Sequence, residues 1–244
     1  MNGQVFLSGM VLSCMPVGEF DRRIVLLTKE RGKISAFARG ARRPKSQLVA
    51  ATNPFVSGDF DVYEGRDSYT VHGADIKNYF EELTSDIELV WYGYYFLEIA
   101  EYFSLENNDE TERLILLYQA FRALLSGKFP VELVRCVYEF KTLVINGDYP
   151  NVFSCGGCDG KKQLFYLSPD KRSVICEDCH GRLGGTAISS SVLYAMQFIT
   201  ATPSAKLFSF TLKEDTQAEL ERITREYYNR YVEHKFKSEA FLGL

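Results

Sequence analysis

Residues 18–47 read GEFDRRIVLLTKERGKISAFARGARRPKSQ, and this basic segment stands out in an otherwise acidic chain. From position 22 to position 45 it carries nine lysines and arginines against a single acid, Glu30. The chain as a whole has a formal charge of −4, so the remainder carries −12 against +8 here. A local concentration of this kind indicates a surface for a polyanion. The alternative is a solvated surface strand and turn.

The basic segment also alternates as a β-strand does. Within residues 33–39, Ile34, Ala36 and Ala38 fall on one face, whereas Phe37 shares the other face with cations. Cations that follow phosphates beside a ring that stacks on a base are typical of single-strand nucleic-acid binding. The alternative is that Phe37 packs under the next hairpin.

The flanking sequence predicts a small β-barrel over residues 1–80. Short strands are expected at 5–14, 23–29, 33–39, 54–64 and 68–77. The gap at 40–53 is long enough for a short helix between the third and fourth strands. Three strands, a helix and two strands is the order of the oligonucleotide-binding (OB) barrel, which binds its ligand on strands 2 and 3. The basic segment falls on those strands; an SH3-like barrel is the alternative.

From about residue 81 the apolar residues recur at helical spacing. Stripes lie within 87–97, 114–125, 133–144, 192–199 and 220–231. We therefore expect an α-helical domain over 81–244, interrupted by an insert at about 151–187. The predicted fold class is α+β.

Four cysteines define the insert. Cys155 and Cys158 form one C-x-x-C pair, and Cys176 and Cys179 form a second after seventeen intervening residues that can hold a hairpin. Four thiolates arranged in this way are typical of a closed, structural zinc site with one Zn²⁺ ion. His180 follows the last cysteine, and we expect it to be a surface neighbour rather than a ligand.

Composition and the absence of catalytic motifs limit the classes of function that the sequence suggests. With 244 residues, of which 46% are hydrophobic, the chain can form two modest domains. It lacks a signal-peptide pattern and a long apolar run, so we expect a soluble, cytoplasmic protein. Neither G-x-S-x-G nor H-E-x-x-H occurs. We predict that the protein is not an enzyme.

This order of parts resembles the RecO family of bacterial DNA repair and recombination mediators over essentially the whole chain. The likeness rests on residues 18–22, 28–33 and 38–43, the four cysteines and the tyrosines of the last helix.

The resemblance implies a non-enzymatic, nucleoid-associated DNA-binding protein of the RecF pathway. RecO-like proteins bind single- and double-stranded DNA and anneal complementary strands, including strands coated by single-strand-binding protein (SSB). They pair with RecR, help to load RecA, and bind the SSB C-terminal tail through the helical part. The alternatives are a scaffold whose basic barrel docks an acidic protein, or an RNA-binding OB protein.

The resemblance and the basic segment together indicate a set of candidate DNA contacts. Phosphate neutralisation would make binding independent of sequence and sensitive to salt. The candidates are Lys33, Arg39, Arg42, Arg43 and Lys45 for phosphates, Phe37 for stacking, and Arg22, Arg23 and Arg31, whose faces the sequence leaves ambiguous.

Overall fold

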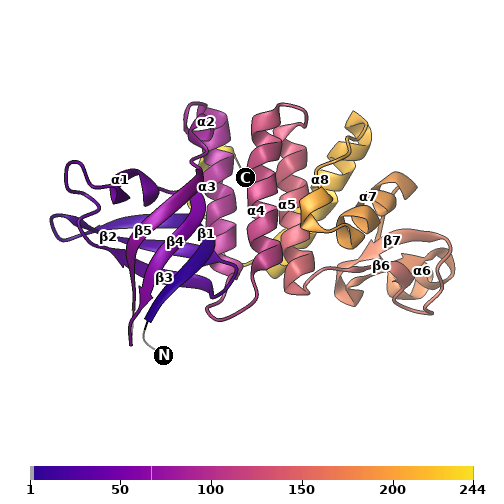
Figure 1. Ribbon diagram of the computed structural model, residues 1–244. Coiled ribbons are helices and arrows are strands. Elements are labelled where there is room, and N and C mark those ends of the chain that lie inside the picture. Colours follow the sequence, from indigo (N-terminus) through magenta and orange to yellow (C-terminus); the bar gives the residue numbers. More distant parts are fainter. Residues whose placement is uncertain (1–2, 67, 244) are drawn as a thin grey trace. The chain divides into compact units, whose positions relative to one another are not determined.

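The computed structural model describes residues 3–66 and 68–243. Two compact units emerge from the packing. The first combines Met1–Leu125 with Lys235–Leu244, and the second is Ser126–His234. The first unit thus includes helices as well as the barrel (Figure 1). The division at residue 80 stays a prediction about domain boundaries.

The first unit begins with a closed five-stranded barrel of order β1-β2-β3-β5-β4. β3 pairs in parallel with β5, and the other neighbours pair antiparallel. The short helix α1 (Leu48–Ala51) lies between β3 and β4 in sequence. The predicted OB-type barrel is confirmed. Its strands are β1 (Gly3–Val17), β2 (Asp21–Thr28), β3 (Gly32–Ala38), β4 (Ser57–Glu64) and β5 (Tyr69–Asn78).

Strand alternation decides what the barrel buries. Ile34, Ala36 and Ala38 lie in its core, as predicted, together with Ile24 and Leu26 of β2. Their neighbours in sequence face outward, so the polar side of β3 remains on the surface. The apolar face of β3 points into the barrel because removing its apolar surface from water stabilises the fold.

Three helices and the C-terminal residues complete the first unit. Asp86 is the N-cap of α3 (Ile87–Phe103). Its carboxylate accepts hydrogen bonds from the backbone N–H groups of Glu88 and Leu89. The C-terminal stretch packs on α3, where Phe241 stacks on Trp91 at 3.7 Å between ring centroids. The other helices are α2 (Glu81–Thr84), α4 (Thr111–Ser126) and α9 (Glu239–Leu242).

The second unit combines helices with a small sheet of order β6-β8-β7-β9. α5 (Val131–Asn146) is its central helix, and the buried Glu139 accepts hydrogen bonds from Arg135 and from Arg225 of α8. The predicted helical part is confirmed. The remaining elements are β6 (Asn151–Cys155), β7 (Leu164–Ser168), η1 (Pro169–Lys171), β8 (Ser173–Cys176), α6 (Glu177–Leu183), β9 (Thr186–Ala187), α7 (Ser190–Ala201), η2 (Ser204–Lys206) and α8 (Glu214–Tyr231).

A helix that crosses a bilayer needs about 20 mostly apolar residues. Over the described ranges, no helix is both long and apolar enough to span a membrane.

Candidate nucleic-acid interface and metal centre

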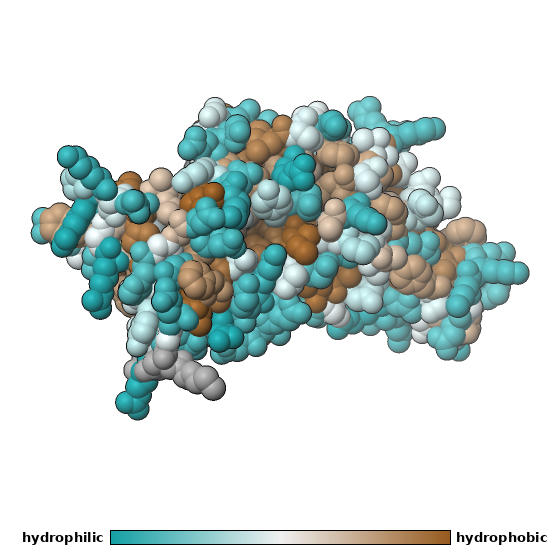
Figure 2. All heavy atoms as spheres, in the orientation of Figure 1, coloured by the Kyte–Doolittle hydropathy of each residue, from teal (hydrophilic) through white to brown (hydrophobic). Residues whose placement is uncertain are grey.

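The basic segment forms β2, β3 and the loop that leads to α1. Arg23 of β2 lies opposite Phe37 of β3 in the antiparallel register. The loop is fixed at its start because the Asp21 carboxylate accepts a hydrogen bond from the Gly40 N–H at 2.7 Å. Hydrophilic side chains project around this end of the barrel, where β2 and α1 lie (Figures 1 and 2).

An aromatic ring, Phe37, and a polar side chain, Ser35, share the outer face of β3. Phe37, next to the last residue of β3, is 36% exposed. Two residues before it, the Ser35 hydroxyl accepts a hydrogen bond from Arg23 Nε at 2.7 Å. Arg23, which lies opposite Phe37 in the strand register, is thereby held across the strand pair. Phe37 and Arg23 are available to a ligand as a ring with a neighbouring cation.

Four cations that follow β3 keep their charge at the surface. Arg39 and Lys45 are exposed and have no side-chain partner within the described part of the chain. Arg42 donates to the Gly18 carbonyl at 3.3 Å, and Arg43 lies 5.3 Å from the centre of the Phe20 ring. Neither contact involves an anion. Arg39, Arg42, Arg43 and Lys45 therefore offer unneutralised charge in the loop that follows Phe37.

Three other candidate cations have partners within the protein. Arg22 Nη1 donates to the Val49 carbonyl, to Thr52 and to Asn53, all at 2.8–2.9 Å, and so holds α1. Lys33 Nζ donates to the Glu101 carbonyl at 2.6 Å, and Arg31 pairs with Glu64 at 3.4 Å. These partners lie 27 to 68 positions away in sequence, which local patterning does not detect.

The four cysteines come together at one point. Their sulfur atoms all lie within 4.8 Å of one another, and those of Cys158 and Cys176 are 3.7 Å apart. Four sulfurs at about 2.3 Å from a shared tetrahedral ion would be separated by roughly 3.8 Å. The quartet therefore fits a single metal ion of zinc's size and coordination.

Strand ends and a tight turn build this quartet. Cys155 and Cys176 end β6 and β8, which are neighbours in the sheet, and Cys179 lies in the first turns of α6. The turn after β6 closes through a hydrogen bond from the Cys155 N–H to the Gly160 carbonyl. A Cβ on Gly157 would lie 2.6 Å from the end of the Leu183 side chain and 3.1 Å from the Cys179 sulfur, so a larger residue would require Leu183 to move.

The environment of Cys155 favours the metal-binding thiolate. Burial alone would raise the pKa of this thiol, but backbone N–H groups lower it to about 6. Two of these donors, from Gly157 and Cys176, lie 3.3 Å from the sulfur. His180 is not among the clustered ligands and instead stacks on Tyr166, 3.5 Å between centroids.

Family comparison covers nearly the whole chain. Residues 1–80 match the model "Recombination protein O N terminal", and residues 84–240 match "Recombination protein O C terminal". The chain belongs to the recombination protein O (RecO) family. The likeness proposed from the sequence is confirmed.

Curated RecO proteins match the chain over most of their own length. "DNA repair protein RecO" of Acetivibrio thermocellus is 33% identical over 239 residues, which is 96% of this chain and 94% of the relative. The protein of the same name from Alkaliphilus metalliredigens is 30% identical, covering 92% and 85%. That of Bacillus subtilis is 26% identical, covering 96% and 92%.

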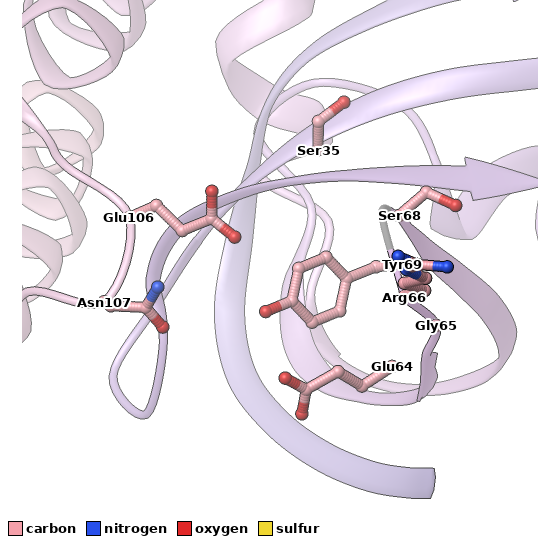
Figure 3. A pocket seen from close by; sticks show the side chains of 8 residues that line it. All are labelled: Ser35, Glu64, Gly65, Arg66, Ser68, Tyr69, Glu106 and Asn107. Carbon is pink, nitrogen blue, oxygen red and sulfur yellow. The ribbon is translucent and has the colours of Figure 1, made fainter. Parts of the chain in front are cut away.

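A polar cavity of about 360 Å³ lies beside β3, at a place that no sequence pattern indicates. Its wall comes from β3, from the β4–β5 connection and from the loop between α3 and α4 (Figure 3). Glu106 and Asn107 of that loop come after the apolar stripe of residues 87–97, and they belong to no binding motif in the sequence. The residues around the cavity are Ser35, Glu64, Gly65, Arg66, Ser68, Tyr69, Glu106 and Asn107.

Proposed function

We propose that this RecO-family chain is a non-enzymatic recombination mediator that binds DNA and anneals complementary strands. Membership of the family supports a role in DNA repair and recombination. The proposal includes single- and double-stranded DNA as ligands, and strands coated by SSB as substrates. It also includes RecR and the SSB C-terminal tail as partners, and assistance to RecA loading.

The observation that carries the proposal is the outer face of β3 with the loop after it. Phe37 is exposed there, Arg23 is fixed beside it, and unneutralised cations follow in the chain. Stacking on one ring is worth about 1–3 kcal/mol per base for any base, and each phosphate contact adds salt-sensitive affinity. Such a surface suits strands of any sequence, as annealing requires. The phosphate contacts we propose are Arg39, Arg42, Arg43 and Lys45.

Zinc has a structural role in this proposal. Four cysteine ligands leave no open coordination position for a substrate or a water molecule. When bound, the ion would link the ends of β6 and β8 to α6 and stabilise the small sheet. The DNA contacts belong to the other compact unit.

A strand-annealing assay tests the function directly. Two complementary oligonucleotides, one with a fluorophore and one with a quencher, are mixed with the purified protein, either bare or coated with SSB. Faster quenching in both cases is the expected result. DNA binding without faster quenching would reject the mediator function, and an absence of binding at low salt would favour the acidic-protein scaffold.

Charge reversal tests the assigned surface. Arg39, Arg42 and Arg43 are changed together to Glu, and the matched control changes the exposed Arg182, Lys206 and Lys213 to Glu. The first variant should lose most affinity for every sequence. Each single Arg→Ala change should lower the salt dependence of binding, the slope of log K against log salt, by nearly one unit. A folded first variant with wild-type affinity would overturn the assignment.

A further inference from the structure

The cavity beside β3 adjoins the proposed DNA surface. Ser35 belongs to both, because it lines the cavity and holds Arg23 beside Phe37. Residues two apart on a strand face are about 6.7 Å apart, a distance that one unstacked nucleotide step can cover. A strand whose base stacks on Phe37 therefore brings a neighbouring base to the mouth of the cavity.

The cavity is preformed, because backbone hydrogen bonds hold its walls in place. Its loop is fixed to the barrel hairpin, since the Asn107 N–H donates to the Arg31 carbonyl at 2.8 Å and the Lys33 N–H donates to the Leu105 carbonyl at 3.0 Å. Its volume of about 360 Å³ lies within the usual range of ligand pockets, about 300–1,000 Å³. A base that enters this cavity meets walls already in place.

Two carboxylates of the cavity can accept hydrogen bonds from a base, beside Arg66 on the same wall and with Glu64 also paired with Arg31 at 3.4 Å. The carboxylates of Glu64 and Glu106 reach toward Tyr69 from two separate elements, and the Asn107 amide lies on the side of the Tyr69 hydroxyl (Figure 3). Carboxylates repel a phosphate and accept hydrogen bonds from base N–H groups. A base with adjacent N–H donors therefore fits the carboxylates of Glu64 and Glu106.

The Tyr69 hydroxyl donates a hydrogen bond to the Glu106 carboxylate. The Tyr69 side chain is 91% buried by the barrel, with the hydroxyl at the cavity. Burial first, and then the charges of Glu64 and Glu106, raise the pKa of this hydroxyl, so it keeps its proton. Because this single proton is already donated to Glu106, the donor for a base carbonyl is the Asn107 amide.

We propose that this cavity is a guanine-binding subsite for one base of the bound single strand. The Watson–Crick edge of guanine offers N1–H and N2–H₂ as adjacent donors to the carboxylates, with O6 as the acceptor for the Asn107 amide. The other bases offer fewer donors on that edge: adenine and cytosine present one amino group each, and thymine presents one N–H. The inference rests on the proposed function and adds a base preference to it.

The test is fluorescence anisotropy with labelled dT oligonucleotides that carry one central guanine, inosine, adenine or cytosine. Inosine retains N1–H and O6 but lacks the 2-amino group. Wild type should bind the guanine strand about five-fold or more tightly than the inosine strand. Glu106→Gln and Glu64→Gln should reduce that ratio toward one and leave dT affinity equal or higher, because a negative charge is removed. Glu82→Gln on the exposed face of α2 is the matched control and should keep the ratio.

The outcomes separate this inference from the proposed function. Tight dT binding with no preference for guanine over inosine would overturn the subsite and leave the DNA surface intact. A guanine preference that survives both glutamine variants would also overturn it. Guanosine monophosphate that binds as tightly as the strand would refute a strand subsite. No binding of any oligonucleotide at low salt would overturn both proposals.

Discussion

The ammonium nitrogen of Lys33 lies 2.6 Å from the carbonyl oxygen of Glu101. Lys33 belongs to β3 and Glu101 to the last turns of α3, so this hydrogen bond joins the barrel to a helix within the first unit. The last carbonyls of a helix lack partners within it and carry its negative dipole end. The charge of Lys33 therefore stabilises the fold at a point where the sequence suggested a phosphate contact.

Replacing this lysine should affect stability more than DNA binding. Lys33→Met should lower the free energy of unfolding by about 1–3 kcal/mol, since a hydrogen bond from a charged donor is lost. The matched variant Arg39→Met should lower DNA affinity and leave stability nearly unchanged. Urea unfolding and oligonucleotide anisotropy measure the two effects. A stable Lys33→Met protein with weak DNA binding would make Lys33 a phosphate contact.

Gly32 should tolerate no side chain. A Cβ there would lie 2.2 Å from the Leu105 carbonyl oxygen, and its φ of +63° favours glycine. Gly32→Ala should cost at least about 2 kcal/mol, because strain adds to the clash. Gly73→Ala, with no atom within 4 Å of the added Cβ and an ordinary φ, is the matched control. Urea midpoints that are equal for the two variants would contradict this contact between the hairpin and the α3–α4 loop.

The sequence predicts features that local patterns determine. The β3 alternation of Ile34, Ala36 and Ala38 against Phe37 specifies which face closes the barrel. The cysteine quartet is equally local, because each C-x-x-C turn places two sulfurs together and one hairpin joins the turns. These are short-range constraints, and a single sequence displays them.

The sequence does not predict which partner a surface cation finds. Arg22 and Lys33 look like their neighbours Arg23 and Arg39 in the basic segment, yet they bind α1 and α3. Their partners include the backbone carbonyls of Val49 and Glu101, and since every residue has a carbonyl, no sequence signal marks them. The cavity escapes prediction for the same reason, since Glu106 reaches it only through the docking of the α3–α4 loop on the hairpin.

Cys136 should make the protein less stable at high pH. Burial raises the pKa of this thiol from 9.0 to about 12. Between these values the unfolded chain has lost the proton and the folded chain retains it, so the free energy of unfolding falls as pH rises from about 9 toward 12. The contribution is fully present below pH 9. It changes by at most about 1.4 kcal/mol per pH unit.

Urea unfolding at several pH values between 9 and 11 measures this slope. Cys136→Ala should reduce it, whereas Val137→Ala, an equally buried truncation in α5, should lower stability at every pH with the slope unchanged. An identical slope in wild type and Cys136→Ala would show that the thiol keeps an ordinary pKa in the fold.

Loss of one cysteine ligand should separate folding from DNA binding. Cys158→Ser should lose the metal and lower the melting temperature by roughly 10 °C or more, because several kcal/mol of metal-binding free energy stabilise the small sheet. Cys14→Ser, which lies outside the quartet, should keep one ion per chain. Metal analysis and thermal melts measure both effects, and a chelator should reproduce them in wild type. Below its melting temperature, Cys158→Ser should anneal DNA normally, since the proposed contacts lie in the barrel. A stable, metal-free variant that selectively lost DNA binding would instead place the metal centre in the interface.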